Sequence, residues 1–223
     1  MTIPLVHSNT RASAFIRANT AIASPPLVPE LRLHLAGDVT ALWQMTERDL
    51  ERQGLPPPYW AFAWPGGQAL ARYLLDHPET ARGKRVWDIG AGGGVSAIAA
   101  LKAGAAAATA FEIDPFALAA IELNGALNDV KPRADSRDVL AAPFAGEADL
   151  ILIGDMCYER PLAERLLAWL RIAAWRADIL LADPGRAYLP KAGLELVISY
   201  AVPTSLDLED RVNRDTAVYR LPG

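Results

Sequence analysis

Residues 86–94 read Val-Trp-Asp-Ile-Gly-Ala-Gly-Gly-Gly, an apolar run that ends in a cluster of glycines. A backbone that turns sharply from a buried strand into a helix needs residues without a Cβ atom. Such residues reach dihedral angles that other residues avoid, and they let a ligand lie against the main chain. Gly90, Gly92 and Gly94 meet this need, so the stretch predicts a strand followed by a ligand-binding turn.

The residues after this turn complete a strand-helix-strand unit. Residues 96–103 are mostly apolar with helical character, and Gly104 follows them. Residues 107–111 form a second strand-like run that leads directly into Glu112. A glycine cluster alone would be weaker support, because such clusters also occur in plain turns and helix caps. With the acidic residue at the strand end, the pattern predicts a βαβ unit that binds a nucleoside.

The glycine spacing and the acidic residue narrow the ligand. The pattern G-x-G-x-G differs from the dinucleotide fingerprint G-x-G-x-x-G, because Val95 stands at the third glycine position. Binding of a pyrophosphate is therefore disfavoured, whereas Glu112 could accept hydrogen bonds from two ribose hydroxyls. We expect S-adenosylmethionine (SAM) as the cofactor and S-adenosylhomocysteine (SAH) as its product. Further cofactor-binding candidates at strand ends are Asp88, Ile113 and Asp138.

A regular alternation of apolar runs and amphipathic stretches follows Gly83, which is typical of the α/β class. We predict a Rossmann-like, seven-stranded, mostly parallel sheet with helices on both faces. Residues 150–153 lack polar alternation, so their strand should be central and covered on both sides. A short charged connection, residues 207–215, predicts that the last two strands form an antiparallel hairpin at the sheet edge. Besides those of the βαβ unit, the expected strands span 134–136, 149–154, 179–182, 194–200 and 216–221, and the expected helices span 115–128 and 161–172.

We predict a single domain over residues 1–223. Residues 83–223 form its core, and residues 1–82 form an N-terminal extension with an aromatic segment that flanks the cofactor and substrate. A helix around residues 13–20 should pack Phe15 and Ile16 onto the core. The first 29 residues contain arginine but no acidic residue, which also resembles an organelle transit peptide.

The composition limits the classes of function. The chain has 223 residues, of which 52% are hydrophobic, enough for the core of one domain. Its net charge of −4 disfavours broad electrostatic binding to nucleic acid. A lone cysteine, Cys157, permits neither an intrachain disulfide nor a thiolate metal cluster, and it is better read as a small hydrophobic residue than as a nucleophile. We predict a soluble protein without a metal and without a membrane span, because no apolar stretch approaches about twenty residues.

Three motifs outside the glycine turn carry a family resemblance. Residues 57–68 read Pro-Pro-Tyr-Trp-Ala-Phe-Ala-Trp-Pro-Gly-Gly-Gln, residues 154–159 read Gly-Asp-Met-Cys-Tyr-Glu, and residues 182–186 read Ala-Asp-Pro-Gly-Arg. With the glycine turn, these motifs resemble the seven-β-strand, SAM-dependent protein lysine methyltransferases. The resemblance covers residues 25–221 and is strongest to the family that methylates the β subunit of electron transfer flavoprotein (ETF).

The resemblance implies a class I methyltransferase fold and methylation of a lysine in a protein substrate, most closely the ETF β subunit. Two departures bear on this reading. Glu112 stands where an aspartate is commoner in the family. It keeps a carboxylate for the ribose hydroxyls, but on a longer side chain. The N-terminal segment is short for a presequence plus a domain, so we expect a bacterial cytoplasmic form, with the mitochondrial matrix as the alternative for a eukaryotic one. Two other readings are a ribosomal protein methyltransferase and a non-catalytic SAM-binding scaffold.

The family motifs also assign roles to side chains. Asp155 and Tyr158 are the expected catalytic residues, in a reaction where a lysine amine attacks the sulfonium methyl in line and alignment is the main contribution of the protein. Asp155 could instead cap the helix that follows it. Trp60 and Trp64 could instead be core aromatics. Trp64 and Asp155 join the cofactor-binding set, and the expected substrate-binding residues are Trp60, Glu159, Asp183 and Arg186.

Overall fold

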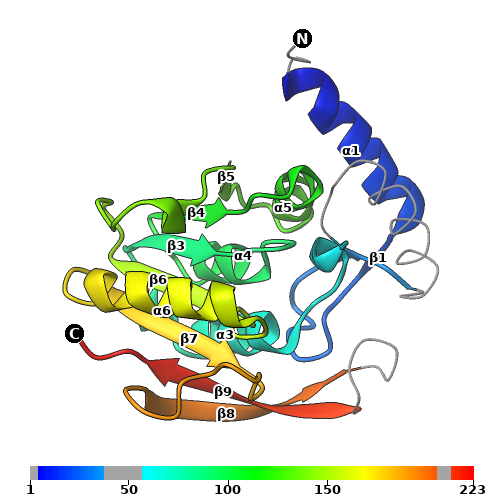
Figure 1. Cartoon of the computed structure of the whole chain (residues 1–223). Helices are drawn as coiled ribbons and strands as arrows, with labels where there is room; N and C mark the ends of the chain where they lie inside the picture. Colours follow the sequence, from blue (N-terminus) through cyan, green and yellow to red (C-terminus); the bar gives the residue numbers. More distant parts are fainter. Residues whose placement is uncertain (1–4, 38–56, 205–211) are drawn as a thin grey trace.

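The computed structural model describes residues 5–37, 57–204 and 212–223. Within them, seven strands form one sheet whose bounds are β3 (Arg85–Ile89), β4 (Ala107–Phe111), β5 (Arg133–Asp135), β6 (Leu150–Gly154), β7 (Asp178–Asp183), β8 (Glu195–Pro203) and β9 (Asn213–Arg220). The order across the sheet is β5-β4-β3-β6-β7-β9-β8 (Figure 1). The first five strands in this order are parallel, and β9 is antiparallel to both of its neighbours. The predicted α/β fold with a final antiparallel hairpin is therefore confirmed.

Helices cover both faces of this sheet. Those that pack on it are α3 (Pro65–Asp76), α4 (Val95–Lys102), α5 (Pro115–Leu127) and α6 (Arg160–Ala173), whereas α1 (Leu5–Asn19) packs on α5. Short 3-10 turns are η1 (Tyr59–Ala61), η2 (Pro78–Thr80) and η3 (Val139–Ala141). The central strand β6 is fully buried: Leu150 and Leu152 pack in the same core cluster as α3 and α4, and Ile151 and Ile153 pack with α6. The prediction of a central strand covered on both faces is confirmed.

Local sequence explains where the helices of the βαβ region begin. Gly94 precedes α4 with a φ of 82°, a left-handed conformation that favours glycine. Asp114 precedes α5, and its side chain accepts a hydrogen bond of 2.8 Å from the amide of Phe116. Pro115 then occupies the first helical position, where its missing amide hydrogen costs nothing.

The N-terminal region differs from expectation in two ways. The predicted helix exists but begins earlier, at Leu5, and it packs on α5 through buried Ile16 and an edge contact of 5.3 Å between the rings of Phe15 and Phe116. A small antiparallel hairpin of β1 (Ala21–Ala23) and β2 (Leu33–Leu35) follows it and was not predicted, because its strands are too short for a periodic pattern. No described helix is both long and apolar enough to span a bilayer.

The final hairpin also differs in extent. β9 begins at Asn213, so Asp215 belongs to the strand and not to the charged connection. Residues 207–211 of that connection lie outside the described residues.

Candidate functional site

A cavity of about 400 Å³ lies at the carboxyl ends of β3, β4 and β6. This is the edge of an open parallel sheet at which ligands bind. Fourteen different residues were predicted to form the site, and the structure brings ten of them to the wall of this cavity. These ten are Trp60, Trp64, Gly90, Gly92, Glu112, Ile113, Asp138, Asp155, Tyr158 and Arg186, whereas Asp88, Gly94, Glu159 and Asp183 lie outside its lining.

The glycine turn forms one wall of the cavity. Gly90 and Gly92 have φ angles of 65° and 51°, which L side chains rarely adopt. A Cβ atom on Gly90 would also lie 2.6 Å from the sulfur of Met156. The turn therefore needs glycine for its conformation and for its close packing, and it exposes a wall of main chain to the cavity.

Glu112 holds the glycine turn from the neighbouring strand. Its Oε2 accepts a hydrogen bond of 3.0 Å from the amide of Gly92, and its Oε1 accepts from the amides of Ile113 and Asp114 at 2.8 and 3.3 Å. Burial raises the pKa of this carboxyl group, and the three amides oppose that shift. Three of about four acceptor positions are thus in use, so one position on Oε2 is left for a ligand hydroxyl.

Asp88 and Gly94 support the turn from behind the cavity. Asp88 is buried and accepts a hydrogen bond of 3.0 Å from the amide of Ala97 in the first turn of α4. Burial raises the pKa of Asp88 to about 7. A Cβ atom on Gly94 would lie 3.1 Å from a side-chain carbon of Ile121. Both residues fix the position of α4, and neither reaches the cavity wall.

Asp138 lines the cavity from the connection after β5, directly before η3. Its Oδ1 accepts a hydrogen bond of 3.1 Å from the amide of Leu140, and its Oδ2 pairs with Arg165 on α6. Arg165 also lines the cavity. The carboxylate of Asp138 is therefore fixed by a side chain of α6, a contact that the sequence did not reveal.

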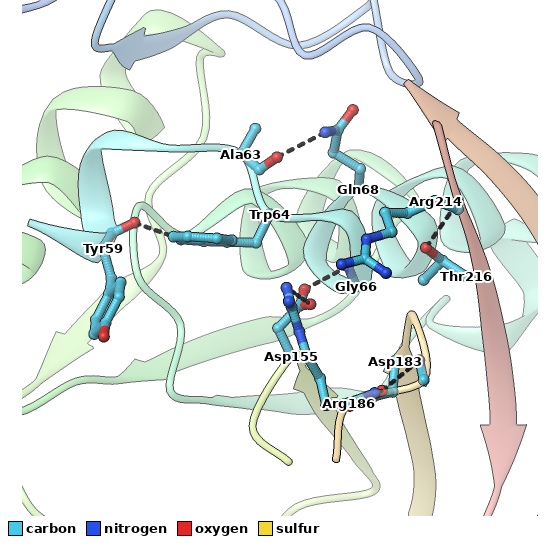
Figure 2. Close-up of polar contacts among 11 residues, drawn as sticks. Tyr59, Ala63, Trp64, Gly66, Gln68, Asp155, Asp183, Arg186, Arg214 and Thr216 are labelled. Carbon is cyan, nitrogen blue, oxygen red and sulfur yellow. Dashed lines mark hydrogen bonds and ion pairs between the residues drawn. The ribbon is translucent and has the colours of Figure 1, made fainter. Parts of the chain in front are cut away.

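Aromatic side chains form another wall. The ring of Tyr59 lies 5.7 Å from that of Trp64 and 5.9 Å from that of Tyr158. The indole of Trp64 donates a hydrogen bond of 2.8 Å to the carbonyl of Tyr59 (Figure 2). Burial raises the pKa of Tyr158 to about 12, so its phenol stays protonated at neutral pH. Trp60 is buried and stacks on Phe116 at 6.2 Å, so it packs the extension onto α5 as well as lining the cavity.

Asp155 lies where three segments meet. Its φ of 57° turns the chain sharply after β6, a conformation that Asp tolerates better than most residues. One carboxylate oxygen accepts a hydrogen bond from the amide of Gly66 in the first turn of α3, and the other pairs with Arg186 at 2.9 Å (Figure 2). Asp155 therefore caps an earlier helix, not the one that follows it. Burial raises the pKa of Asp155 to about 6, outweighing the opposite effect of Arg186.

The loop after β7 presents Arg186 to Asp155. Asp183 is buried and accepts hydrogen bonds from the amides of Gly185 and Arg186 at 2.8 and 2.6 Å. The guanidinium of Arg186 also lies over the ring of Trp64, 5.8 Å from its centre. Asp183 thus shapes the loop and does not line the cavity. Glu159 is exposed just before α6, and its charge contributes to the raised pKa of Tyr59 and Tyr158.

The cysteine and the potential metal ligands give no sign of other catalytic chemistry in the described residues. Cys157 is buried in the core beside α6, and burial raises its thiol pKa to about 12, which argues against a nucleophilic role. The described residues contain no group of three or more side chains that could hold a metal ion.

Sequence reasoning missed several cavity residues. Tyr59 lies inside the quoted aromatic motif, and Met156 lies inside the motif after β6, so proximity to named residues could have found both. Arg165 on α6 also lines the cavity, but it lies in none of the quoted motifs, so no sequence pattern gave a reason to select it.

Comparison with known proteins identifies the family. The profile of the ribosomal protein L11 methyltransferase (PrmA) family matches residues 69–154, which include the glycine turn. The ETF β-subunit lysine methyltransferase of Xenopus laevis is 43% identical over 182 residues, covering 81% of this chain and 73% of that protein. The mouse (Mus musculus) protein of the same name is 37% identical over 219 residues, covering 94% and 84%. The chain belongs to the ETF β-subunit lysine methyltransferase family.

Solved structures agree with this family at the level of the fold. The ribosomal protein L11 methylase from Lactobacillus delbrueckii subsp. bulgaricus superimposes with a TM-score of 0.50 at 20% identity, covering 71% of this chain and 79% of that one. The chain therefore shares the fold of this methylase.

Proposed function

We propose that this enzyme transfers methyl groups from SAM to a lysine side chain of the ETF β subunit. One observation carries the proposal: a single cavity joins the glycine turn and Glu112 to the aromatic wall and Asp155. A nucleoside cofactor and an acceptor amine could therefore meet within it. The names of the most similar relatives support the choice of substrate.

The residues around the glycine turn fit SAM. The turn offers main chain without side chains, and Oε2 of Glu112 offers a ribose hydroxyl an acceptor. The carboxylates of Glu112 and Asp114 both line the cavity here, and they would repel a pyrophosphate. Asp138 and Ile113 are the proposed contacts to the adenine. When bound, SAM supplies an electrophilic methyl group on a positively charged sulfur.

The acceptor lysine is proposed to enter between the aromatic wall and Asp155. The faces of Trp64 and the neighbouring tyrosines can hold a cationic or neutral amine against the cavity wall. Tyr158 is at the rim and stays protonated, so it orients the amine and does not act as a base. Glu159 is exposed near Tyr158 and gives the rim a negative charge that suits a lysine-bearing segment.

The ion pair between Asp155 and Arg186 favours the neutral amine that the reaction needs. A free lysine has a pKa of about 10.4. An unpaired carboxylate would raise that pKa further, but the charge of Arg186 balances the carboxylate of Asp155 at 2.9 Å. Desolvation by the aromatic wall and the nearby guanidinium then both lower the pKa of the amine. Asp155 holds the amine in line, and the proton leaves to water or to the carboxylate.

The test uses purified ETF, labelled SAM and mass spectrometry of the β subunit. We expect wild-type enzyme to methylate a lysine of that subunit. D155N should lower kcat by about 100-fold or more, the loss expected for a misaligned nucleophile, while its Kd for SAH changes little. D178N is the matched control, because Asp178 forms an exposed ion pair with Lys84 at the far end of the sheet. Full activity in D155N would remove Asp155 from the mechanism.

A ribosomal protein is the second candidate substrate, favoured by the PrmA match to residues 69–154. That match covers the cofactor half of the site and leaves out the loop of Arg186. We therefore rank a ribosomal protein below ETF as the proposed substrate. Parallel assays with ETF and with ribosomal protein L11 separate the two, since labelling of L11 alone would overturn our choice.

The proposed substrate is a protein and not a nucleic acid, and the proposed location is the bacterial cytoplasm.

A further inference from the structure

Two asparagines take the place of a strand beside β2: Asn124 on α5, and Asn128 directly after the last residue of that helix. Asn128 accepts a hydrogen bond of 3.0 Å from the amide of Arg32 and donates one of 2.7 Å to its carbonyl. Asn124, one helical turn earlier, accepts a bond of 2.7 Å from the amide of His34. These two side chains thus bond the edge of the N-terminal hairpin that faces away from β1, and they dock the hairpin onto the core.

Asn124 makes a second bond that Asn128 does not. Its Nδ2 donates a hydrogen bond of 2.9 Å to the carbonyl of Gly93, inside the glycine turn. Asn124 is fully buried. A Cβ atom on Gly93 would lie only 2.9 Å from the carbonyl oxygen of Trp60 and 3.2 Å from Nδ2 of Asn124. Gly93 is therefore packed closely against both the aromatic segment and the side chain of Asn124.

The bonds on successive residues of the turn complement one another. Glu112 holds the amide of Gly92 from the cavity side, and Asn124 holds the carbonyl of Gly93 from the rear. A run of glycines has little intrinsic preference for one conformation. These two side chains therefore help to fix its shape, together with main-chain bonds from Gly90 and Ala91 to Phe111. Loss of Asn124 would leave the buried carbonyl of Gly93 without its side-chain donor and free the turn to relax.

We propose that Asn124 is a positioning residue for the cofactor: it couples the docked N-terminal hairpin to the shape of the glycine turn. This inference rests on the proposed function, because it assumes that the turn binds SAM. The bonds of Asn124 to His34, Gly93 and Asn128 lie among the hairpin, the glycine turn and α5, away from Asp155 and the aromatic wall. Its removal should therefore weaken cofactor binding and spare the rate of methyl transfer once the cofactor is saturating.

The test compares N124A with N128A. The side chain of Asn128 makes three hydrogen bonds, to both main-chain groups of Arg32 and to the carbonyl of Asn124, and these do not include the glycine turn. We expect N124A to raise the Kd for SAH, measured by calorimetry, and the KM for SAM by about tenfold, with kcat within about twofold of wild type. N128A should lower Tm at least as much as N124A, yet keep its Kd for SAH within about twofold.

A second variant covers the case in which N124A fails to fold. N124D keeps an acceptor for the amide of His34 and loses the donor to Gly93, so it should show the same tenfold loss as an alanine would. An unchanged Kd in N124A or N124D overturns the inference, as does an equal loss in N128A. Failure of wild-type enzyme to bind SAH would instead overturn the proposed function.

Discussion

At the scale of single residues, the charge on Arg186 should set the pH range of activity. Burial raises the pKa of Asp155 to about 6, and Arg186 opposes that rise. R186M removes the charge but keeps a long side chain, so the pKa of Asp155 should rise further, by about one unit or more. We expect the acidic limb of the kcat/KM profile to move to higher pH by that amount. R186K should return the acidic limb to its wild-type pH. An acidic limb at the same pH in R186M and wild type would contradict the role given to the ion pair.

Asp88 should make the stability of the protein depend on pH. Its pKa is raised from 3.8 to about 7, mainly by burial, with Glu112 as its charged neighbour. The folded chain therefore holds this proton more tightly than the unfolded chain. The contribution to stability is complete below about pH 4 and is lost as the pH rises through about 7.

D88N cannot ionise and keeps an oxygen for the amide of Ala97. Between about pH 4 and pH 8, its Tm should fall less than that of wild type by at least about 2–4 °C, the effect of 1 kcal/mol in a domain of this size. Thermal unfolding of both proteins across that range measures the difference. Parallel curves would show that Asp88 titrates normally.

At the scale of elements, the position of the first turn of α3 should determine the position of Asp155 on the acceptor side of the cavity. A Cβ atom on Gly66 would lie 2.5 Å from the carbonyl oxygen of Ala182 and from Oδ2 of Asp155. G66A must therefore displace the first turn of α3 or Asp155. We expect it to lower the free energy of unfolding, measured in urea, by about 1–3 kcal/mol and to reduce kcat.

G37A is the control for this prediction. A Cβ atom on Gly37 meets nothing within 4 Å, so the free energy of unfolding should change by about 0.5 kcal/mol or less. A G66A variant as stable and active as G37A would mean that α3 adjusts without disturbing the site.

The elements also explain which predictions succeeded. The strands and helices after Gly83 coincide with changes of local pattern, so the sequence predicted them within a few residues. The helix α3, which packs in the same core cluster as β6, was not predicted. The hairpin of β1 and β2 was missed because each strand has three residues, and those of β1 are all exposed. In the site, residues at strand ends such as Glu112 and Asp155 were found from their place in the chain. The contacts of Asp155 with Gly66 and Arg186 were not predicted, because these partners lie 89 and 31 residues away, although Arg186 itself was an expected substrate-binding residue.

At the scale of the whole molecule, ligand binding should stabilise the folded state as a unit. A ligand at about 100 times its Kd adds about 2.7 kcal/mol of stability. For a domain of this size that corresponds to a rise in Tm of about 5–10 °C. We expect this rise with SAH and none with NADH, measured by calorimetric scanning at matched concentrations. A rise with NADH alone would contradict the reading of the glycine turn.

The two side chains that bond the main chain of Gly92 and Gly93 come from residues that the ribosome adds later. Glu112 and Asn124 both follow the glycine turn in the chain, and the Asp155–Arg186 pair follows them in turn. A nascent chain that ends before residue 124 lacks the donor for the carbonyl of Gly93 and both members of the ion pair. Competence to recognise the cofactor is thus acquired late in synthesis, and a truncated product would have no functional pocket to offer.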